Sequence, residues 1–135
     1  MKKEMLRDGI VLRRLMDDFQ KQKNEDTLFR ILVCLKDSTV YVPCVRFTGK
    51  GDVVTTIDGI SYAFQPFSKG NQEYAALFTN LEQMKELDSS FVKMEVEFLE
   101  IFKYIQVKSF VGIVLDPMTN SLVIPNSLFE IMKKI

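Results

Sequence analysis

The side chains that carry most acid–base and nucleophilic chemistry in proteins are scarce in this sequence. Histidine is absent, which excludes a Ser-His-Asp triad, a Cys-His pair and an HExxH zinc site. Cys34 and Cys44 are the two cysteines, too few for a structural zinc site, so we expect no metal and no cofactor. They lie ten positions apart, without CxxC spacing, and we interpret them as reduced thiols of a cytoplasmic protein.

The residues present offer two kinds of catalytic site, a nucleophilic thiol and a pair of carboxylates. Cys44 follows Pro43 and is expected to be more exposed than Cys34, but a reactive thiol needs a lowered pKa, and a structural thiol is favoured. The glutamates at positions 95, 97 and 100 form a row typical of a solvated helix face, not of an acid pair in an apolar cleft. We therefore predict no catalytic residues.

Charge and hydropathy argue against two classes of partner. Eighteen Lys and Arg residues balance eighteen Asp and Glu residues and are interspersed with them, so the chain lacks the basic stripe that nucleic acid requires. The longest apolar run, Phe110 to Leu115, is far shorter than the ~20 residues that cross a bilayer. Since the N-terminus also lacks an apolar signal region, we predict a cytoplasmic protein that binds neither nucleic acid nor membranes. A length of 135 residues predicts a single domain over residues 1–135.

Apolar spacing and capping residues predict two helices before the first strand. An i, i+3, i+4, i+7 stripe predicts an amphipathic N-terminal helix within residues 1–23. The stripe consists of Leu12, Leu15, Met16 and Phe19. Asn24 is suited to cap a second helix that ends near Lys36.

The middle of the chain is rich in strand and turn signals. A strand is predicted over residues 39–47, in which Pro43 marks a sheet edge or the strand's end because it has no N–H to donate. Asp58-Gly59 lies between two strand-like segments and predicts a hairpin with a type I′ turn. A further short strand is expected over residues 74–78.

Two capping boxes and one apolar stripe predict the later helices. Thr79 with Glu82 fits a capping box for a short helix over residues 80–87, and Ser127 with Glu130 fits a second one for a last helix over residues 128–134. A longer helix is predicted from apolar residues at helical spacing. These residues are Met94, Phe98, Phe102 and Ile105.

A continuous apolar run near the C-terminus predicts the most buried strand. Residues 111–115 are nearly all apolar, which suits a strand covered on both faces, and residues 116–120 form a turn before a strand over 122–124. Helices alternate irregularly with hairpins. This order predicts an α+β fold, a mostly antiparallel mixed sheet with helices packed against it.

Two segments together resemble a known family. Ala75-Ala76-Leu77-Phe78-Thr79-Asn80-Leu81-Glu82 is similar to a strand-to-helix corner of the SseB N-terminal domain family. Gly112-Ile113-Val114-Leu115-Asp116-Pro117, followed by Leu122-Val123-Ile124-Pro125, is similar to that family's hairpin before a final helix. The resemblance implies an SseB-like α+β fold, a small cytosolic bacterial protein and no catalytic residues to carry over.

The chain departs from that family at defined places. Asp116 stands where the family usually has Asn, and Met118 where Gly often follows the proline. Many members carry a second, C-terminal domain, and the resemblance implies that this chain ends before one. The family's name refers to enhanced serine sensitivity, which is a phenotype and not a mechanism.

The two resembling corners supply the candidate site. If they lie side by side in one sheet, their polar residues define a surface, and backbone amides at a helix start there can hold an anion. The candidate ligand-binding residues are Thr79, Asn80, Asp116, Thr119 and Asn120. No metal-binding residues are predicted.

The sequence favours a non-enzymatic interaction module of undefined partner over a catalyst. The partner is expected to be another protein or a second copy of the chain, paired through a sheet edge near Pro43 or the hairpin. The alternative is a protein that binds a small molecule or an anion, or an enzyme that uses carboxylate, Lys or Cys chemistry.

Overall fold

The computed structural model describes residues 9–49, 53–87, 90–108 and 110–135. The first eight residues of the predicted N-terminal helical segment lie outside these ranges. Helix α2 (Ile10–Lys21) and helix α3 (Glu25–Lys36) pack against each other. The predicted cap of the second helix is confirmed, since Asn24 Oδ1 accepts a hydrogen bond from Thr27 N at 2.8 Å.

Strands β1 (Thr39–Arg46), β2 (Val53–Ile57), β3 (Ile60–Phe64) and β6 (Val92–Glu97) form the first sheet. Its order is β2-β3-β1-β6, and the pairs are antiparallel. The predicted hairpin joins β2 to β3, where Asp58 and Gly59 adopt φ of 51° and 80°, as a type I′ turn requires. We call this sheet A.

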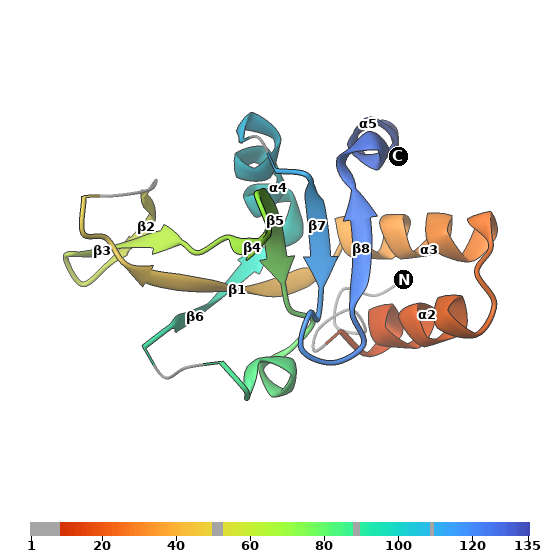
Figure 1. Ribbon diagram of the computed structural model, residues 1–135, viewed down its shortest axis with the longest axis horizontal. Helices are drawn as coiled ribbons and strands as arrows, with labels where there is room; N and C mark the ends of the chain where they lie inside the picture. Colours follow the sequence, from red (N-terminus) through yellow and green to blue (C-terminus); the bar gives the residue numbers. More distant parts are fainter. Residues whose placement is uncertain (1–8, 50–52, 88–89, 109) are drawn as a thin grey trace.

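Strands β4 (Phe67–Lys69), β5 (Gln72–Leu77), β7 (Gly112–Leu115) and β8 (Leu122–Pro125) form sheet B, in the order β4-β5-β7-β8. Strands β5 and β7 are parallel neighbours, whereas the other two pairs are antiparallel. All four residues of β7 are buried, which confirms the expectation of a strand covered on both faces. Sheet B strands run crosswise to those of sheet A (Figure 1).

The remaining helices are short. A 3₁₀ turn, η2 (Leu81–Met84), follows β5; helix α4 (Phe98–Val107) follows β6 directly; and η3 (Asn126–Leu128) leads into α5 (Phe129–Lys134). The predicted α+β class with mostly antiparallel strands is confirmed. Among the described residues, no helix is both long and apolar enough to cross a membrane.

One large core lies between the helices and the two sheets. The stripe of α2 contributes Leu12 and Met16, which are 1% and 0% exposed. Phe102 joins the C-terminal helices, because its ring stacks on Phe98 at 5.2 Å between centroids and meets Phe129 edge-on at 5.4 Å. A smaller apolar cluster lies on the opposite face of sheet B, around Phe78.

Pro43 lies inside an interior strand, so the prediction that it marks an edge or an end is wrong. Strand β1 pairs with β6 along one side. Along its other side it pairs first with Phe78 and then, further along the strand, with β3. Tyr41 exchanges two backbone hydrogen bonds of 2.8 Å with Phe78, and the Pro43 carbonyl accepts from Gln65 N at 3.0 Å. The missing N–H of Pro43 therefore falls at the junction between two neighbouring strands, where a gap in the ladder costs little.

The predicted long helix around Met94 is also wrong in its first half. Residues 92–97 form β6, and only Phe98 onward is helical. Half-buried Val92, Met94 and Val96 alternate with exposed charged residues, which is the period-2 pattern of a strand. Phe98, Phe102 and Ile105 are buried in α4, as predicted for the helical stripe.

Two smaller predictions, the exposure of Cys44 and the cap of the last helix, are also wrong. Cys44 is 0% exposed, so it is no more exposed than Cys34. Helix α5 has no side-chain cap from Ser127 or Asn126. Instead Asn126 Nδ2 donates to the Phe110 carbonyl at 3.0 Å.

Candidate functional site

The two predicted corners do lie side by side. Thr79 follows β5 and Asp116 follows β7, and the register of these parallel strands places Leu77 opposite Leu115. Because the carboxyl ends of parallel strands meet at one edge of a sheet, the residues after them become neighbours. We call this region the Thr79–Asp116 corner, made of Thr79, Asn80, Gln83, Asp116, Thr119 and Asn120.

A buried carboxylate joins the two strands at the corner. Asp116 Oδ1 accepts from Thr79 N at 2.8 Å, and Asp116 Oδ2 accepts from Thr79 Oγ1 at 2.8 Å. Both residues are 0% exposed. The Asp116 amide donates to the Leu77 carbonyl at 2.9 Å, so side chain and backbone together connect the end of β7 to the end of β5.

Burial dominates the electrostatics of Asp116. Desolvation raises the pKa of this carboxyl group, while the two hydrogen bonds from Thr79 and the positive charge of Arg13 act in the opposite direction. Asp116 also has a positive φ of 48°, a conformation that Asp and Asn tolerate better than most residues. The position thus combines a constrained backbone with a buried acceptor.

Thr79 does not cap the short helix, contrary to the capping-box prediction. Its hydroxyl is engaged by Asp116, and Asn80 is the N-cap instead, with Asn80 Oδ1 accepting from Gln83 N at 3.1 Å. The segment is a four-residue 3₁₀ turn and not a helix over residues 80–87. The Gln83 amide already has an acceptor, and anion binding by the amides of residues 80–82 stays a prediction.

The other two predicted residues hold the turn after β7 against its neighbours. Thr119 N donates to the Asp116 carbonyl at 3.1 Å, and Thr119 Oγ1 donates to Gln83 Oε1 at 2.6 Å. Asn120 Nδ2 donates to Asp17 Oδ1 of α2 at 2.5 Å. Gly9 approaches from the start of α2, since a Cβ there would lie 2.5 Å from Thr79 Cβ.

All five predicted site residues are thus gathered at one corner, and each makes a polar contact within the chain. Chemically, the arrangement fixes the ends of β5 and β7 to each other and to α2. Ligand binding at this corner stays a prediction. No group of three or more His, Cys, Asp and Glu residues suited to a metal occurs in the described ranges.

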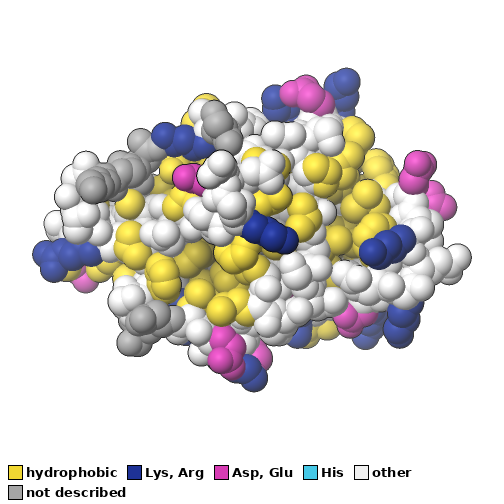
Figure 2. Space-filling model, in the orientation of Figure 1, with side chains coloured by type: hydrophobic (Ala, Val, Ile, Leu, Met, Phe, Trp, Pro, Cys, Tyr) yellow, Lys and Arg dark blue, Asp and Glu magenta, His cyan; other side chains and the backbone are white. Residues whose placement is uncertain are grey.

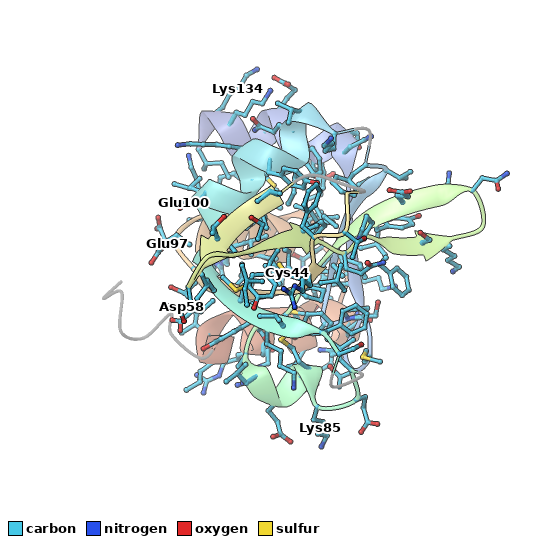
Figure 3. The ribbon with its side chains drawn as sticks, turned by 90° about the vertical axis from the view of Figure 1, so that its left-hand side faces the viewer. Cys44, Asp58, Lys85, Glu97, Glu100 and Lys134 are labelled. Carbon is cyan, nitrogen blue, oxygen red and sulfur yellow. The ribbon has the colours of Figure 1, made fainter. Side chains whose placement is uncertain are left out.

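Both cysteines are buried, and neither has the exposed, low-pKa thiol that a nucleophile requires. Burial raises the pKa of the Cys44 thiol to about 11, so little thiolate forms near neutral pH. Cys34 is buried as expected and the pKa of its thiol is also raised by burial; its carbonyl accepts from Ser38 Oγ at 2.7 Å. Both thiols are free, and Figure 3 shows Cys44 in the interior.

The corner and its two strands lie within the part of the chain that matches a known family. A family model described as the SseB protein N-terminal domain matches residues 12–128. The chain belongs to the SseB N-terminal domain family. The match extends from the α2 stripe through the β7–β8 hairpin to the start of the last helix. No curated protein and no solved structure matches the chain significantly.

Sequence reasoning missed an apolar cleft on the face of this SseB domain shown in Figure 2. The cleft has a volume of about 210 Å³ and lies where β1, the β3–β4 link and the β7–β8 turn meet. None of its lining residues is charged. They include Pro43, Pro66, Phe67, Phe78, Phe91 and Met118. We call it the front cleft; the clustering of prolines and aromatics far apart in sequence gave no local signal.

A second hollow lies between sheet A and α4, and we call it the α4 trough. Its volume is about 550 Å³, and its lining combines mostly apolar residues of β1, β2 and β6, with Thr55 and Glu95 among them, with Glu100, Lys103 and Tyr104 of α4. Glu97 and Glu100 lie beside each other at the β6–α4 junction, at the periphery of the molecule (Figure 3). Glu97 lies on a strand, so the predicted row of three glutamates on one helix is not present.

Proposed function

We propose that this SseB-family domain is a non-enzymatic interaction module that binds an extended segment of another protein in the front cleft. One observation carries the proposal: the cleft is lined entirely by uncharged residues, and two of them, Phe67 and Met118, are 42% and 44% exposed at its rim. Exposed apolar surface around a concave site is typical of protein-binding surfaces.

The size of the cleft supports a side chain as its occupant. Pockets for small-molecule ligands have volumes of roughly 300–1,000 Å³. The front cleft, at about 210 Å³, is smaller and suits one or two apolar side chains of a partner. Strand β4 lies beside the cleft, carries Phe67 and forms one edge of sheet B. An extended segment of a partner can therefore run alongside β4.

Backbone geometry adds a polar anchor inside the cleft. The carbonyls of Glu73 and Leu77 accept from the β7 side, so the alternation along β5 turns the N–H and C=O of Ala76 the other way. There Ala76 lines the cleft together with Pro43 and Pro66, neither of which has an N–H to donate. A partner's backbone amide can supply that donor to the Ala76 carbonyl.

The proposal also includes a cytoplasmic setting and no catalysis. Two free, buried thiols in one domain are typical of proteins kept in reducing compartments. The raised pKa of Cys44 supports a structural thiol, and the contacts of Asp116 with Thr79 support a structural carboxylate.

Selection from a phage-displayed library of random peptides tests the front cleft. We expect enriched peptides to share an apolar anchor residue and to shift the amide resonances of Phe67, Ala76 and Phe78 on titration. Met118→Lys is expected to weaken the binding of a selected peptide by about tenfold or more, because it places a charge at an apolar rim.

Val123→Lys is the matched control, since Val123 is 50% exposed on β8 and does not line the cleft. It is expected to bind the selected peptides as the wild type does. Failure of the library to enrich any peptide, or equal binding by the Met118→Lys variant, contradicts the proposal.

The α4 trough supports a second candidate function, the binding of a small molecule. Its volume of about 550 Å³ lies within the usual range for ligands, and it presents two carboxylates, Glu95 and Glu100, and the ammonium group of Lys103 beside apolar walls. A thermal-shift screen of zwitterionic amphiphiles tests it. We expect stabilisation by a hit to be lost in Ile101→Trp, which fills the trough, and retained in Met118→Lys.

A further inference from the structure

The outer edge of β6 is available for pairing. Strand β6 ends the order β2-β3-β1-β6, and no described strand pairs with its other side. All six of its residues are in register with β1 on the inner side. An edge strand of this length presents a row of backbone donors and acceptors that a further strand can use.

The register shows which backbone groups point outward. On β1, Tyr41 bonds to Phe78 and the Pro43 carbonyl accepts from Gln65. The backbone N–H and C=O groups of the odd-numbered residues of β1 therefore point away from β6. The backbone groups of the even-numbered residues then point toward β6, in agreement with the hydrogen bond from Phe98 N to the Ser38 carbonyl at 2.9 Å.

The β6 residues opposite those even-numbered positions face inward too. Val92, Met94 and Val96 pair with β1 residues 44, 42 and 40, so they direct their backbone groups to β1. Lys93 and Glu95 lie between them and direct their N–H and C=O groups to the open edge. Their side chains are exposed, on the face opposite that of the half-buried apolar side chains.

The sequence of this edge is complementary to itself. Residues 92–96 read Val-Lys-Met-Glu-Val, which is symmetric about Met94 in apolar character and opposite in charge at its two polar positions. An antiparallel second copy centred on Met94 places Lys93 opposite Glu95 of that copy, and Val92 opposite its Val96. Within residues 92–96, every cross-strand neighbour is then either apolar with apolar or positive with negative.

Charge selects this register among those that keep the faces matched. Moving the centre to Glu95 keeps two opposite-charge pairs, Lys93 with Glu97, but adds a pair of glutamates at the centre, and moving it to Lys93 sets two lysines against each other. Like charges directly opposite destabilise a strand pair. A shift of the centre by half a residue instead puts a charged side chain on the apolar face.

We propose that the chain forms a symmetric dimer through antiparallel pairing of β6 with β6 of a second copy, centred on Met94. The two four-stranded A sheets become one continuous sheet. In this arrangement Lys93 and Glu95 of each copy exchange backbone hydrogen bonds with Glu95 and Lys93 of the other. The contact is independent of the front cleft, so it goes beyond the proposed function.

The area of such a contact is small, which sets the concentration at which it is measurable. A single pair of strands with five residues from each copy lies at the low end of interface sizes. We therefore expect a reversible dimer that forms between about 10 μM and about 1 mM, and not an obligate one. Sedimentation equilibrium of the full chain over that range gives the dissociation constant.

Charge reversals distinguish this register from any other mode of association. Glu95→Lys and Lys93→Glu each set like charges opposite each other at both symmetric positions, and each is expected to raise the dissociation constant at least about tenfold. The double variant Lys93→Glu/Glu95→Lys restores opposite charges and is expected to dimerise like the wild type. An equimolar mixture of the two single variants is expected to form a heterodimer.

Glu86→Lys serves as the matched control, because Glu86 is exposed and the substitution changes the net charge by the same amount as Glu95→Lys. It is expected to leave the dissociation constant unchanged. Circular dichroism and thermal melting confirm that each variant is folded. A monomer at every concentration overturns the proposal, and so does a dimer that the single reversals leave intact.

Discussion

The Thr79–Asp116 corner and the outer edge of β6 both place charged or polar residues next to a strand. At the corner Thr79 and Asp116 are buried and hydrogen-bonded within the chain, whereas the charged residues of β6 are exposed. At the corner, Asp116 is 0% exposed, and its two carboxylate oxygens accept hydrogen bonds from Thr79 N and Thr79 Oγ1. On β6, Lys93 and Glu95 are exposed and point away from the sheet that holds them.

The difference shows where this chain uses polar groups for its own stability and where it leaves them for a partner. A buried acceptor that loses its donors costs far more than an exposed one, because water cannot replace them. Substitutions at the corner are therefore expected to act on the free energy of unfolding. Substitutions at the β6 edge are expected to act on association alone.

Asp116→Ala is expected to give the largest loss of stability. It removes the acceptor of two hydrogen bonds and leaves the buried Thr79 amide without a partner, which costs about 2–4 kcal/mol of unfolding free energy. Urea denaturation measures the change. Asp116→Asn is the control and is expected to stay within about 1 kcal/mol of the wild type, because its Oδ1 accepts from Thr79 N and Thr79 Oγ1 can accept from its Nδ2.

Gly9→Ala is expected to follow, with a loss of about 2 kcal/mol. Gly9 has φ of 66°, and an added Cβ would lie 2.5 Å from Thr79 Cβ and 2.7 Å from its carbonyl oxygen. Gly70→Ala separates the two causes, since Gly70 has nearly the same φ, 63°, with nothing within 4 Å of the added Cβ. It is expected to cost only about 1 kcal/mol, the backbone share alone. Equal losses in the two variants would show that the corner does not restrict Gly9.

The pH dependence of stability is expected to distinguish Asp116 from Asn at the same position. Because burial raises the pKa of Asp116, the folded state binds its proton more tightly than the unfolded state does. The contribution of this group to stability therefore falls as pH rises from its unfolded value of 3.8 through the raised folded pKa.

Urea denaturation of the wild type and of Asp116→Asn from acidic to neutral pH measures this contribution. The stability of Asp116→Asn relative to the wild type is expected to increase over that range. A relative stability that decreases with rising pH would mean that Thr79 and Arg13 outweigh desolvation, and that the carboxylate itself is favoured.

The single reversals Lys93→Glu and Glu95→Lys are expected to have the smallest effect on stability, within about 0.5 kcal/mol for the monomer. Both side chains are exposed, and the β6 bonds to β1 are made by the even-numbered residues between them. Thermal denaturation at a concentration well below the dimer range tests this. A loss as large as that of Gly9→Ala would remove the contrast between the two regions.

Local sequence signals predicted those elements whose structure depends on near neighbours. Asn24 caps α3, Asp58-Gly59 forms the β2–β3 turn, and the apolar run of β7 is buried throughout. The proximity of Thr79 and Asp116 was also predictable, because both follow strands of one sheet. The hydrogen bond between them was not predictable, since Thr79 and Glu82 also fit the sequence pattern of a capping box.

Residues 92–98 show why local rules are insufficient. Met94 and Phe98 fit the helical stripe that continues to Phe102 and Ile105, while Val92, Met94 and Val96 alternate as in a strand. Both periods are present in the same residues. The decision comes from β1, which lies far away in sequence and offers a six-residue ladder, so β6 is a strand up to Glu97 and α4 begins at Phe98.

By itself, the sequence determined the helix stripes, the hairpin turn, the buried strand β7 and the absence of histidine chemistry, because each depends on residue type or on spacing of a few positions. The tertiary structure decided that Asp116 takes the Thr79 hydroxyl, that Pro43 lies inside a sheet, and that prolines and aromatics from separate segments enclose the front cleft. These outcomes depend on which strands become neighbours, and a strand's neighbours are fixed by pairing across long sequence separations.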